Sequence, residues 1–308
     1  MEKFIKLWHH IFMIKKQQIY TIKETLDYGK QVLKDANIET SNIDARVLLS
    51  YITGMKHHEF ITSPKTTIPP KLYKAYQKVI KRRSKSEPIA QITGKREFYS
   101  LPFKVSKGTL IPRPDTETII DAIKSEFKNQ NDEYKILDMG TGTGCILLTL
   151  LHHFKKSFGI GIDINHNAIK TAKQNAKFLS LHTRSKILKL SWHNKKPSKK
   201  LIEHKFHIIV SNPPYITKHD MMQLDKDVKN YEPQTALYGG NDGLDEYRHL
   251  SKSIYHWDIL EKKGKIFLEL GKGQEEDVKK IFEAFGFKFQ KYFKDLNGII
   301  RVIEFTKD

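Results

Sequence analysis

The chain has 308 residues, 39% of them hydrophobic, a formal net charge of +19 and a single cysteine, Cys145. This composition suits one large domain or two smaller ones, and it excludes a disulfide framework, a cysteine-based zinc site and a membrane span of about 18 apolar residues. The positive charge favours an anionic partner such as nucleic acid, but the excess of lysine over arginine fits an AT-rich coding sequence equally well, so charge alone names no partner.

Three helices are predicted near the N-terminus. Thr21 and Glu24 have the spacing of a capping box, and apolar residues follow them at helical intervals. Asn42 is the expected cap of a second helix that ends near Gly54. A third helical pattern follows Pro69-Pro70 and ends in a basic run.

These patterns divide the chain into four segments. Residues 1–19 form an extension, disordered or helical, without the features of a targeting signal. Residues 20–85 form a helical domain that we expect to recognise the substrate. In residues 86–118, two β-prone pieces flank Leu101-Pro102, which predicts a β-hairpin linker. Residues 119–308 form the remaining domain.

From about residue 133, β-prone apolar runs alternate with helical segments. The runs are YKILDM, FGIGID, SKILKL, FHIIVSN and GKIFLEL, and two last strands surround Asn297-Gly298. Alternation of this kind is typical of a parallel, doubly wound α/β sheet. The fold class predicted for this domain is therefore α/β.

A glycine-rich loop follows the first of these strands in the segment ILDMGTGTGC. Gly140, Gly142 and Gly144 allow a tight turn that brings backbone N–H groups close to a ligand. The dinucleotide pattern G-x-G-x-x-G fails because Cys145 stands at its third glycine, and no phosphate-binding P-loop pattern occurs. Both facts disfavour NAD, FAD and nucleoside triphosphates.

An acidic residue, Asp163, closes the next predicted strand. A carboxylate at this place can accept two hydrogen bonds from the diol of a ribose. A ligand with a ribose but no pyrophosphate fits the combination of loop and acid. We therefore predict that the cofactor is S-adenosyl-L-methionine.

The fourth strand ends in Asn212, Pro213, Pro214 and Tyr215. Proline cannot donate to a sheet ladder, so the pair must end the strand. In a doubly wound sheet that reverses direction at its first strand, this end lies beside the glycine loop. The tetrapeptide is therefore predicted to face the methyl donor.

Its chemistry suits a planar NH₂ group conjugated to a carbonyl or a ring. The Asn212 side-chain oxygen and the Pro213 carbonyl can accept its two N–H bonds, and Tyr215 can stack on the flat group. Such orientation can contribute on the order of 7 kcal/mol or more. No general base is obligatory, since the proton can leave after transfer.

These motifs resemble those of the bacterial release factor glutamine methyltransferases, the PrmC/HemK type. The resemblance runs from about residue 20 to the end of the chain. Its landmarks are EPIAQITGKREFYSLPFKVSKGTLIPRPDTET, ILDMGTGTG, GIDI, SNPPYI, YEPQTALYGGNDGLDEYR and KDLNGIIRV.

The resemblance implies a helical N-terminal domain joined by a β-hairpin to a seven-stranded class I methyltransferase sheet. It implies transfer of a methyl group from S-adenosyl-L-methionine to the glutamine of the Gly-Gly-Gln motif in class 1 peptide-chain release factors. We expect a cytoplasmic monomer that needs neither membrane nor nucleic acid, although its charge allows weak non-specific binding of nucleic acid.

The resemblance also implies a role for individual residues. Asp163 would bind the ribose and Trp192 would lie along the adenine, whereas Ser191 stands where relatives often carry an acid. Arg113 and Glu117 belong to a motif near the site without an assigned role. The donor would be lined by Gly140, Thr141, Gly142, Thr143, Gly144 and Asn212, and the glutamine held by Asn212, Pro213, Pro214 and Tyr215.

Two other functions compete with this interpretation. An amino-methyltransferase acting on DNA adenine or RNA guanine would use the same tetrapeptide, but it needs a surface to flip and read a base. The helical domain shows no nucleic-acid recognition motif. A non-catalytic binding module would have lost part of the site, whereas here the glycines, the acid and the tetrapeptide are all present.

Overall fold

The computed structural model describes residues 20–194, 196, 197, 201 and 203–307. The predicted extension, residues 1–19, lies outside the described residues. The chain divides into two compact units, with the boundary between Thr93 and Gly94. In the described part, no helix is long and apolar enough to cross a bilayer.

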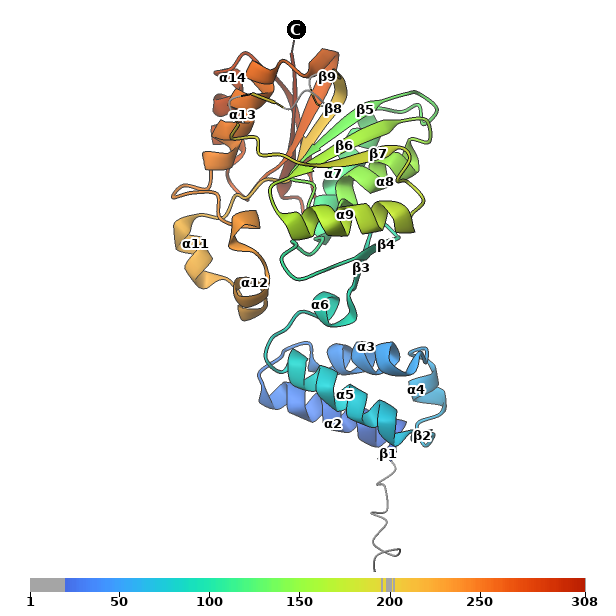
Figure 1. The fold of residues 1–308 in the computed structure, drawn as a ribbon. Helices are drawn as coiled ribbons and strands as arrows, with labels where there is room; N and C mark the ends of the chain where they lie inside the picture. The colour runs from blue at the N-terminus through green and yellow to red at the C-terminus, as the bar shows by residue number, and fades with distance from the viewer. Residues whose placement is uncertain (1–19, 195, 198–200, 202, 308) are drawn as a thin grey trace, which may run out of the picture. The chain divides into compact units, whose positions relative to one another are not determined.

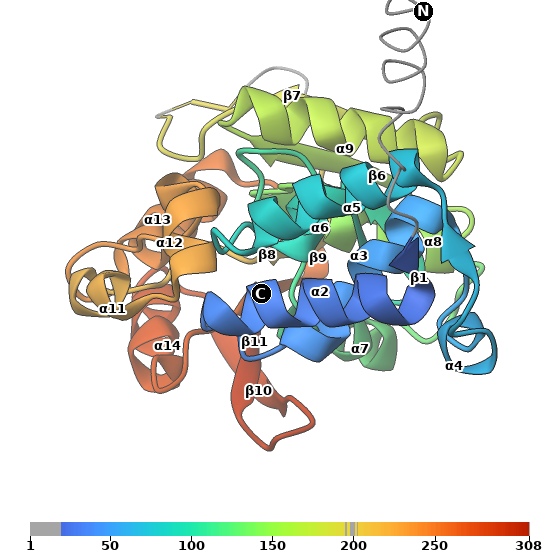
Figure 2. The ribbon, with the colours of Figure 1, turned by 90° about the horizontal axis from the view of Figure 1, so that it is seen from below.

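The first unit is built from three main helices that pack on one another (Figures 1 and 2). Its elements are β1 (Tyr20–Thr21), α2 (Ile22–Asp35), α3 (Ser41–Thr53), α4 (Glu59–Thr62), β2 (Thr67–Ile68), α5 (Pro70–Arg83) and α6 (Ile89–Thr93). Helices α2, α3 and α5 each turn an apolar face inward, and Leu33, Leu48 and Tyr76 are fully buried between them. The prediction of a small helical domain is confirmed.

The predicted start of α2 and the predicted end of α3 are confirmed, and α5 ends in the predicted basic run. The Thr21 hydroxyl accepts from the Glu24 N–H at 3.2 Å while the Glu24 carboxylate accepts from the Thr21 N–H at 2.8 Å, which completes the capping box. Gly54 ends α3 in the left-handed conformation, with φ +74°. The prediction that Asn42 caps α3 was wrong. The backbone bond from Asp44 N–H to the Thr40 carbonyl starts the helix two residues earlier.

The second unit begins with a hairpin, β3 (Lys95–Phe98) and β4 (Leu101–Lys104). The predicted turn at Leu101-Pro102 was wrong. The chain turns at Tyr99 and Ser100, whose φ angles of +50° and +60° match the twist of a two-residue hairpin loop. Pro102 sits within β4 opposite Glu97, at a pair next to the closing one, where an antiparallel ladder needs no N–H from it.

A seven-stranded sheet forms the centre of the second unit, as predicted. Its strands are β5 (Lys135–Met139), β6 (Phe158–Asp163), β7 (Ser185–Lys189), β8 (Phe206–Ser211), β9 (Leu260–Glu269), β10 (Lys288–Lys294) and β11 (Ile300–Thr306). Their order is β10-β11-β9-β8-β5-β6-β7. The pairs from β9 to β7 are parallel, and β11 is antiparallel to both of its neighbours.

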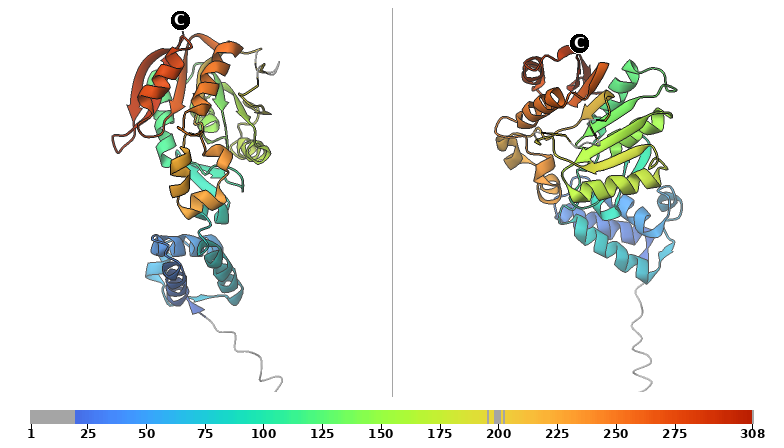
Figure 3. Two further views of the ribbon diagram at one scale, coloured as in Figure 1. Left: turned by 90° about the vertical axis from the view of Figure 1, so that its left-hand side faces the viewer. Right: turned by 45° about the horizontal axis from the view of Figure 1, so that its top comes forward.

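Helices cover both faces of this sheet (Figure 3). Helices α7 (Glu117–Glu126), α8 (Cys145–His153) and α9 (His166–Phe178) bury Ile136, Val210 and Phe267 on one face. Helices α13 (Asp245–Trp257) and α14 (Glu275–Glu283) bury Leu137 and Ile209 on the other. Alternate residues of one strand therefore enter opposite cores, as a pleated strand requires. Among the described residues, the unit also has the short elements η1 (Pro114–Thr116), α11 (Lys218–Gln223), α12 (Lys226–Tyr231) and η2 (Gln234–Ala236).

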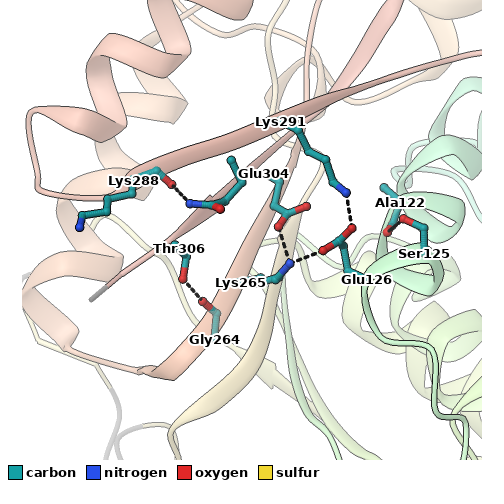
Figure 4. Close-up of polar contacts among 10 residues, drawn as sticks. Ala122, Ser125, Glu126, Gly264, Lys265, Lys288, Lys291, Glu304 and Thr306 are labelled. Atoms are coloured by element: carbon teal, nitrogen blue, oxygen red, sulfur yellow. Dashed lines mark hydrogen bonds and ion pairs between the residues drawn. The ribbon is translucent and has the colours of Figure 1, made fainter.

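The end of α7 is fastened to the sheet by charge pairs (Figure 4). Glu126 accepts from Lys265 on β9 and from Lys291 on β10, and Lys265 also donates to the buried Glu304 on β11 at 2.6 Å. Burial raises the pKa of Glu126, but the two lysines outweigh this effect and hold that pKa below its usual value. These ion pairs hold α7, and the η1 turn that precedes it, against strands β9, β10 and β11.

The order in which strands are added to the sheet reverses at β5: β6 and β7 lie on one side of it, and β8 lies on the other. Strands β5 and β8 are adjacent and parallel, with Asp138 opposite Val210. The Ser211 hydroxyl donates to the Met139 carbonyl at 2.5 Å, which joins the last residues of the two strands. The glycine loop and the Asn-Pro-Pro-Tyr segment therefore leave the sheet side by side. This neighbourhood was predicted from chain order alone and is confirmed.

Candidate active site

A cleft of about 720 Å³ opens in the second unit at the carboxyl ends of β5, β6 and β8. Open α/β sheets bind ligands at this kind of place, and the volume is typical of small-molecule sites. Eight of the predicted site residues line the cleft: Gly140, Thr141, Gly142, Thr143, Asp163, Trp192, Asn212 and Pro214. Three others, Gly144, Pro213 and Tyr215, are not among its lining residues.

The glycine loop connects β5 to α8 through three left-handed residues. Gly140, Gly142 and Gly144 have φ angles of +85°, +55° and +81°, which side-chain-bearing residues rarely adopt. A Cβ on Gly140 would lie 3.2 Å from the Trp192 ring. A Cβ on Gly144 would instead meet Leu148 at 3.1 Å, so this glycine serves the close packing of the loop on the helices.

Asp163 ends β6 and holds the glycine loop in place. Its Oδ2 accepts from the Gly142 N–H at 2.9 Å, and its Oδ1 accepts from the Asn165 N–H at 2.8 Å. Burial raises its pKa, and these backbone hydrogen bonds counteract that shift. The Ile164 N–H is a third backbone group that lowers this pKa. A carboxylate has about four acceptor sites, so it can still accept a hydrogen bond from a ligand in the cleft.

Trp192 forms the cleft wall beside the glycine loop, and two residues of α13 hold it in place. Its indole N–H donates to Glu246 Oε2 at 2.6 Å, and the Ser253 hydroxyl donates to its backbone carbonyl. His193 Nε2 lies 2.8 Å from the same Glu246 oxygen. Glu246, on α13, was not identified from the sequence, because 54 residues separate it from Trp192.

Ser191 stands before Trp192 in the cleft wall. Its hydroxyl oxygen accepts from the His193 N–H at 3.1 Å, which closes a short turn at this point. No group among the described residues accepts the hydroxyl proton, so it can be donated to a ligand.

Asn212 lies at the floor of the cleft and is half-buried. Its side-chain NH₂ donates to the Thr116 hydroxyl at 3.2 Å. Among the described residues, no group donates to its Oδ1 or to the carbonyl of Pro213. Both acceptors named in the sequence prediction are therefore without a donor in this part of the chain, and Asn212 is the one of the two residues that lines the cleft.

Pro213 and Pro214 are buried, and the chain that follows them is held by several hydrogen bonds. Gln274 donates to the Tyr215 carbonyl at 3.0 Å, and Ile216 pairs with Leu237 and Gly239 through backbone hydrogen bonds. The segment is rigid because of these contacts as well as its prolines.

Tyr215 packs against the core of the sheet, and its hydroxyl lies 3.4 Å from Glu269 Oε1. Burial raises the pKa of the Tyr215 hydroxyl, and the negative charge of Glu269 adds to the shift. Burial likewise raises the pKa of Glu269 to about 7. The Tyr215 side chain therefore anchors the segment to the core. It does not line the cleft, so the predicted stacking on a ligand does not account for its position.

The predicted linker supplies a whole wall of the cleft, which the sequence did not reveal. Gly108, Thr109, Leu110 and Pro112 line it. Arg113 also lines it and pairs with Glu232, whose other oxygen accepts from the Ile111 N–H at 3.1 Å. Burial raises the pKa of Glu232, and the charge of Arg113 opposes this shift.

Glu117, which had no assigned role, accepts from the Tyr99 N–H at 2.8 Å. It therefore joins the hairpin turn to the start of α7. It is not a lining residue of the cleft.

The mouth of the cleft is formed by the chain after the tetrapeptide. Lys218, Met221 and Met222 on α11 line it, together with Lys229 on α12. Met222 is 66% exposed. An exposed methionine next to two lysines gives the mouth an adaptable apolar contact and a positive charge.

Within the part of the chain that the structure describes, no cluster of histidine, cysteine and acidic side chains could hold a metal ion.

Comparison with known proteins shows the family of this chain. A model described as "PrmC N-terminal domain" matches residues 24–94, and one described as "Methyltransferase small domain" matches residues 116–229. A release factor glutamine methyltransferase of Agrobacterium fabrum is 36% identical over 290 residues, which cover 93% of this chain and 98% of the relative. The chain belongs to the release factor glutamine methyltransferase family.

Other relatives agree with this assignment. A release factor glutamine methyltransferase of Bradyrhizobium diazoefficiens is 36% identical over 278 residues, covering 89% of this chain and 91% of the relative. The solved hMettl16 catalytic domain superposes with a TM-score of 0.52 at 15% identity, over 66% of this chain and 75% of that chain, which supports the fold alone. The class I methyltransferase fold is confirmed, and the PrmC N-terminal match ends where the first compact unit ends.

Proposed function

We propose that this chain transfers a methyl group from S-adenosyl-L-methionine to the side-chain amide nitrogen (N5) of the glutamine in the Gly-Gly-Gln motif of class 1 peptide-chain release factors. One observation carries the proposal: the glycine loop and Asn212 line the same cleft at the junction of β5 and β8. Membership of the release factor glutamine methyltransferase family supports the choice of substrate. We expect the reaction to take place in the cytoplasm, where release factors act.

The residues around the glycine loop fit S-adenosyl-L-methionine. Asp163 is a buried carboxylate with lone pairs available for a ribose diol. Trp192 offers a flat wall for the adenine, and the missing side chain of Gly140 leaves the space that a Cβ would fill beside that ring. The chemistry that this cofactor supplies, when bound, is a methyl group on a positively charged sulfur.

The tetrapeptide would hold the glutamine. An amide nitrogen is a poor nucleophile because its lone pair is delocalised into the carbonyl. Asn212 Oδ1 and the Pro213 carbonyl accept its two N–H bonds and fix the direction of that nitrogen. Orientation of this kind can contribute about 7 kcal/mol or more. We assign Tyr215 the task of anchoring the segment through its contact with Glu269.

The test is a transfer assay with labelled donor and several acceptors. The purified chain is incubated with a class 1 release factor, with the same factor carrying glutamate in place of the motif glutamine, with duplex DNA and with ribosomal RNA. The proposal predicts label in the unaltered factor alone.

Label that enters DNA or RNA, but not the factor, would contradict the proposal and favour an amino-methyltransferase acting on nucleic acid. Equal labelling of the glutamate variant would show that another residue is the acceptor.

A further inference from the structure

Thr116 lines the cleft beside Asn212 and has no role in the function proposed above. Thr116 ends the η1 turn and is only 3% exposed, and its hydroxyl accepts from the Asn212 NH₂ at 3.2 Å. Within the described residues, Asn212 is the one side chain that donates to this hydroxyl. The hydroxyl therefore still has its own proton to donate.

A buried acceptor lies next to this proton. Glu269, at the end of β9, is 1% exposed, and its Oε2 has no partner that meets full hydrogen-bond geometry in the described part of the chain. The Thr116 side chain is close enough to this carboxylate to oppose the effect of burial on its pKa. A buried carboxylate oxygen without a hydrogen bond costs free energy. Donation of the Thr116 hydroxyl proton to Glu269 therefore lowers the free energy of the folded state more than donation to Asn212 would.

A hydroxyl has one proton and can donate only once. If Thr116 donates to Glu269, its oxygen can only accept from Asn212. The Asn212 amide must then turn its NH₂ toward Thr116 and its Oδ1 toward the cleft. The reverse orientation would place NH₂ against the N–H bonds of an incoming amide and repel it.

We infer that Thr116 and Glu269 are positioning residues that fix the orientation of the Asn212 amide, so that its oxygen faces the acceptor nitrogen. This inference rests on the proposed function, because it assigns Asn212 Oδ1 to the substrate amide. The relay runs from Asn212 through the Thr116 oxygen to the Glu269 carboxylate, over elements that lie 96 and 153 residues apart in sequence from Thr116.

The test compares two substitutions of Thr116 in the full-length chain. Thr116→Val keeps the shape of the side chain and removes the hydroxyl, whereas Thr116→Ser keeps the hydroxyl. We expect Thr116→Val to lower kcat by about 100-fold, the cost of a misplaced reacting group, with little change in the affinity for S-adenosylhomocysteine. Thr116→Ser should retain most of the wild-type kcat.

Thr149→Val is the matched control. Thr149 is also a buried threonine, 2% exposed, but its hydroxyl has no partner among the described residues and it lies on α8 outside the cleft lining. Its substitution should leave kcat unchanged. A Thr116→Val variant as active as Thr149→Val, or a Thr116→Ser variant as damaged as Thr116→Val, would overturn the inference.

A second readout does not depend on the acceptor. The side-chain NH₂ of Asn212, assigned by its loss in Asn212→Ala, should exchange with solvent slowly in the wild type and in Thr116→Ser, and faster in Thr116→Val. Equal exchange in all three chains would refute the relay. If exchange behaves as expected while no release factor is methylated, the proposed function fails and the relay stands.

Discussion

Gly140 shows how one residue type serves both the backbone and the ligand. Its φ of +85° is a conformation that only glycine adopts without strain. Its missing side chain also leaves room beside the Trp192 ring, which a Cβ would approach to 3.2 Å. The glycine spacing predicted a ligand loop, but the contact with Trp192 depends on a residue 52 positions further along the chain, in the turn after β7.

Gly140→Ala is expected to weaken binding of S-adenosylhomocysteine and to destabilise the fold. The control is Gly273→Ala, where φ is +82° but no atom lies within 4 Å of the added Cβ. Both substitutions carry the left-handed backbone cost of about 1 kcal/mol, and only the first displaces Trp192. Calorimetric titration should show a loss of affinity in Gly140→Ala alone, and an equal loss in both would contradict the account.

A pH dependence follows from Glu269. Burial raises its pKa to about 7, Thr116, Arg301 and Tyr215 oppose this shift, and Asp115 adds to it. Above pH 7 the carboxylate is charged and accepts the Thr116 proton. Below pH 7 the carboxyl carries its own proton, so the Thr116 hydroxyl is free to donate to Asn212 and turn its amide.

The kcat at saturating substrates should therefore fall as the pH falls through about 7. In Glu269→Gln the side chain cannot titrate but keeps a carbonyl oxygen as an acceptor, so its kcat should be nearly independent of pH over this range. A rate profile that keeps the same inflection in Glu269→Gln would assign the titration to another group.

At the level of elements, the strands could be predicted because local sequence patterns mark them. Side-chain contacts between residues far apart in the chain could not be predicted in this way. The five parallel strands, the glycine loop and the prolines are each marked by consecutive residues. The hairpin turn was misplaced because Pro102 resembles a turn residue, whereas Tyr99 and Ser100 adopt positive φ without glycine. The linker wall also depends on long-range contacts, such as that between Ile111 and Glu232, 121 residues apart.

Asn175 is the residue that joins these elements. It lies on α9, is fully buried, and its side chain bonds both backbone groups of Lys104 and the carbonyl of Thr143 in the glycine loop, at 2.8 to 3.1 Å. Asn175→Ala leaves three buried backbone groups without this partner, each costing about 1 to 3 kcal/mol if unsatisfied.

We expect Asn175→Ala to lower the free energy of unfolding by at least about 2 kcal/mol and to weaken donor binding. Asn167→Ala is the control on the same helix, because that side chain is exposed and exposed substitutions change stability by about 0.5 kcal/mol or less. Chemical denaturation curves that do not differ between the two variants would show that the hydrogen bonds of Asn175 do not stabilise the fold.

At the scale of the whole molecule, the cleft belongs to one of two compact units. Every residue that lines the cleft lies after Gly94, so the second unit holds the candidate donor and glutamine sites by itself. In the first unit, Lys74, Lys78 and Lys81 line a groove of about 350 Å³ together with Tyr28 and Val32. A basic groove of this kind suits an acidic protein surface, which supports a role of this unit in binding the release factor.

Removal of residues 1–93 should therefore weaken binding of the release factor much more than binding of S-adenosylhomocysteine. Both affinities can be measured on the truncated and full-length chains after thermal unfolding shows that the second unit is folded. Equal losses of both affinities would mean that the first unit supports the fold and does not bind the factor.

The central claim is that a rigid segment aims an amide nitrogen at the methyl donor held by the neighbouring loop. It is tested most directly by the mass of the release factor peptide that contains Gly-Gly-Gln, after incubation with donor and either the wild-type chain or Asn212→Ala. We predict that the wild-type chain adds the mass of one methyl substitution at the glutamine, and that Asn212→Ala, still folded and still binding donor, adds it slower by orders of magnitude. An unmodified peptide with the wild-type chain, or near-normal turnover by Asn212→Ala, would contradict the account.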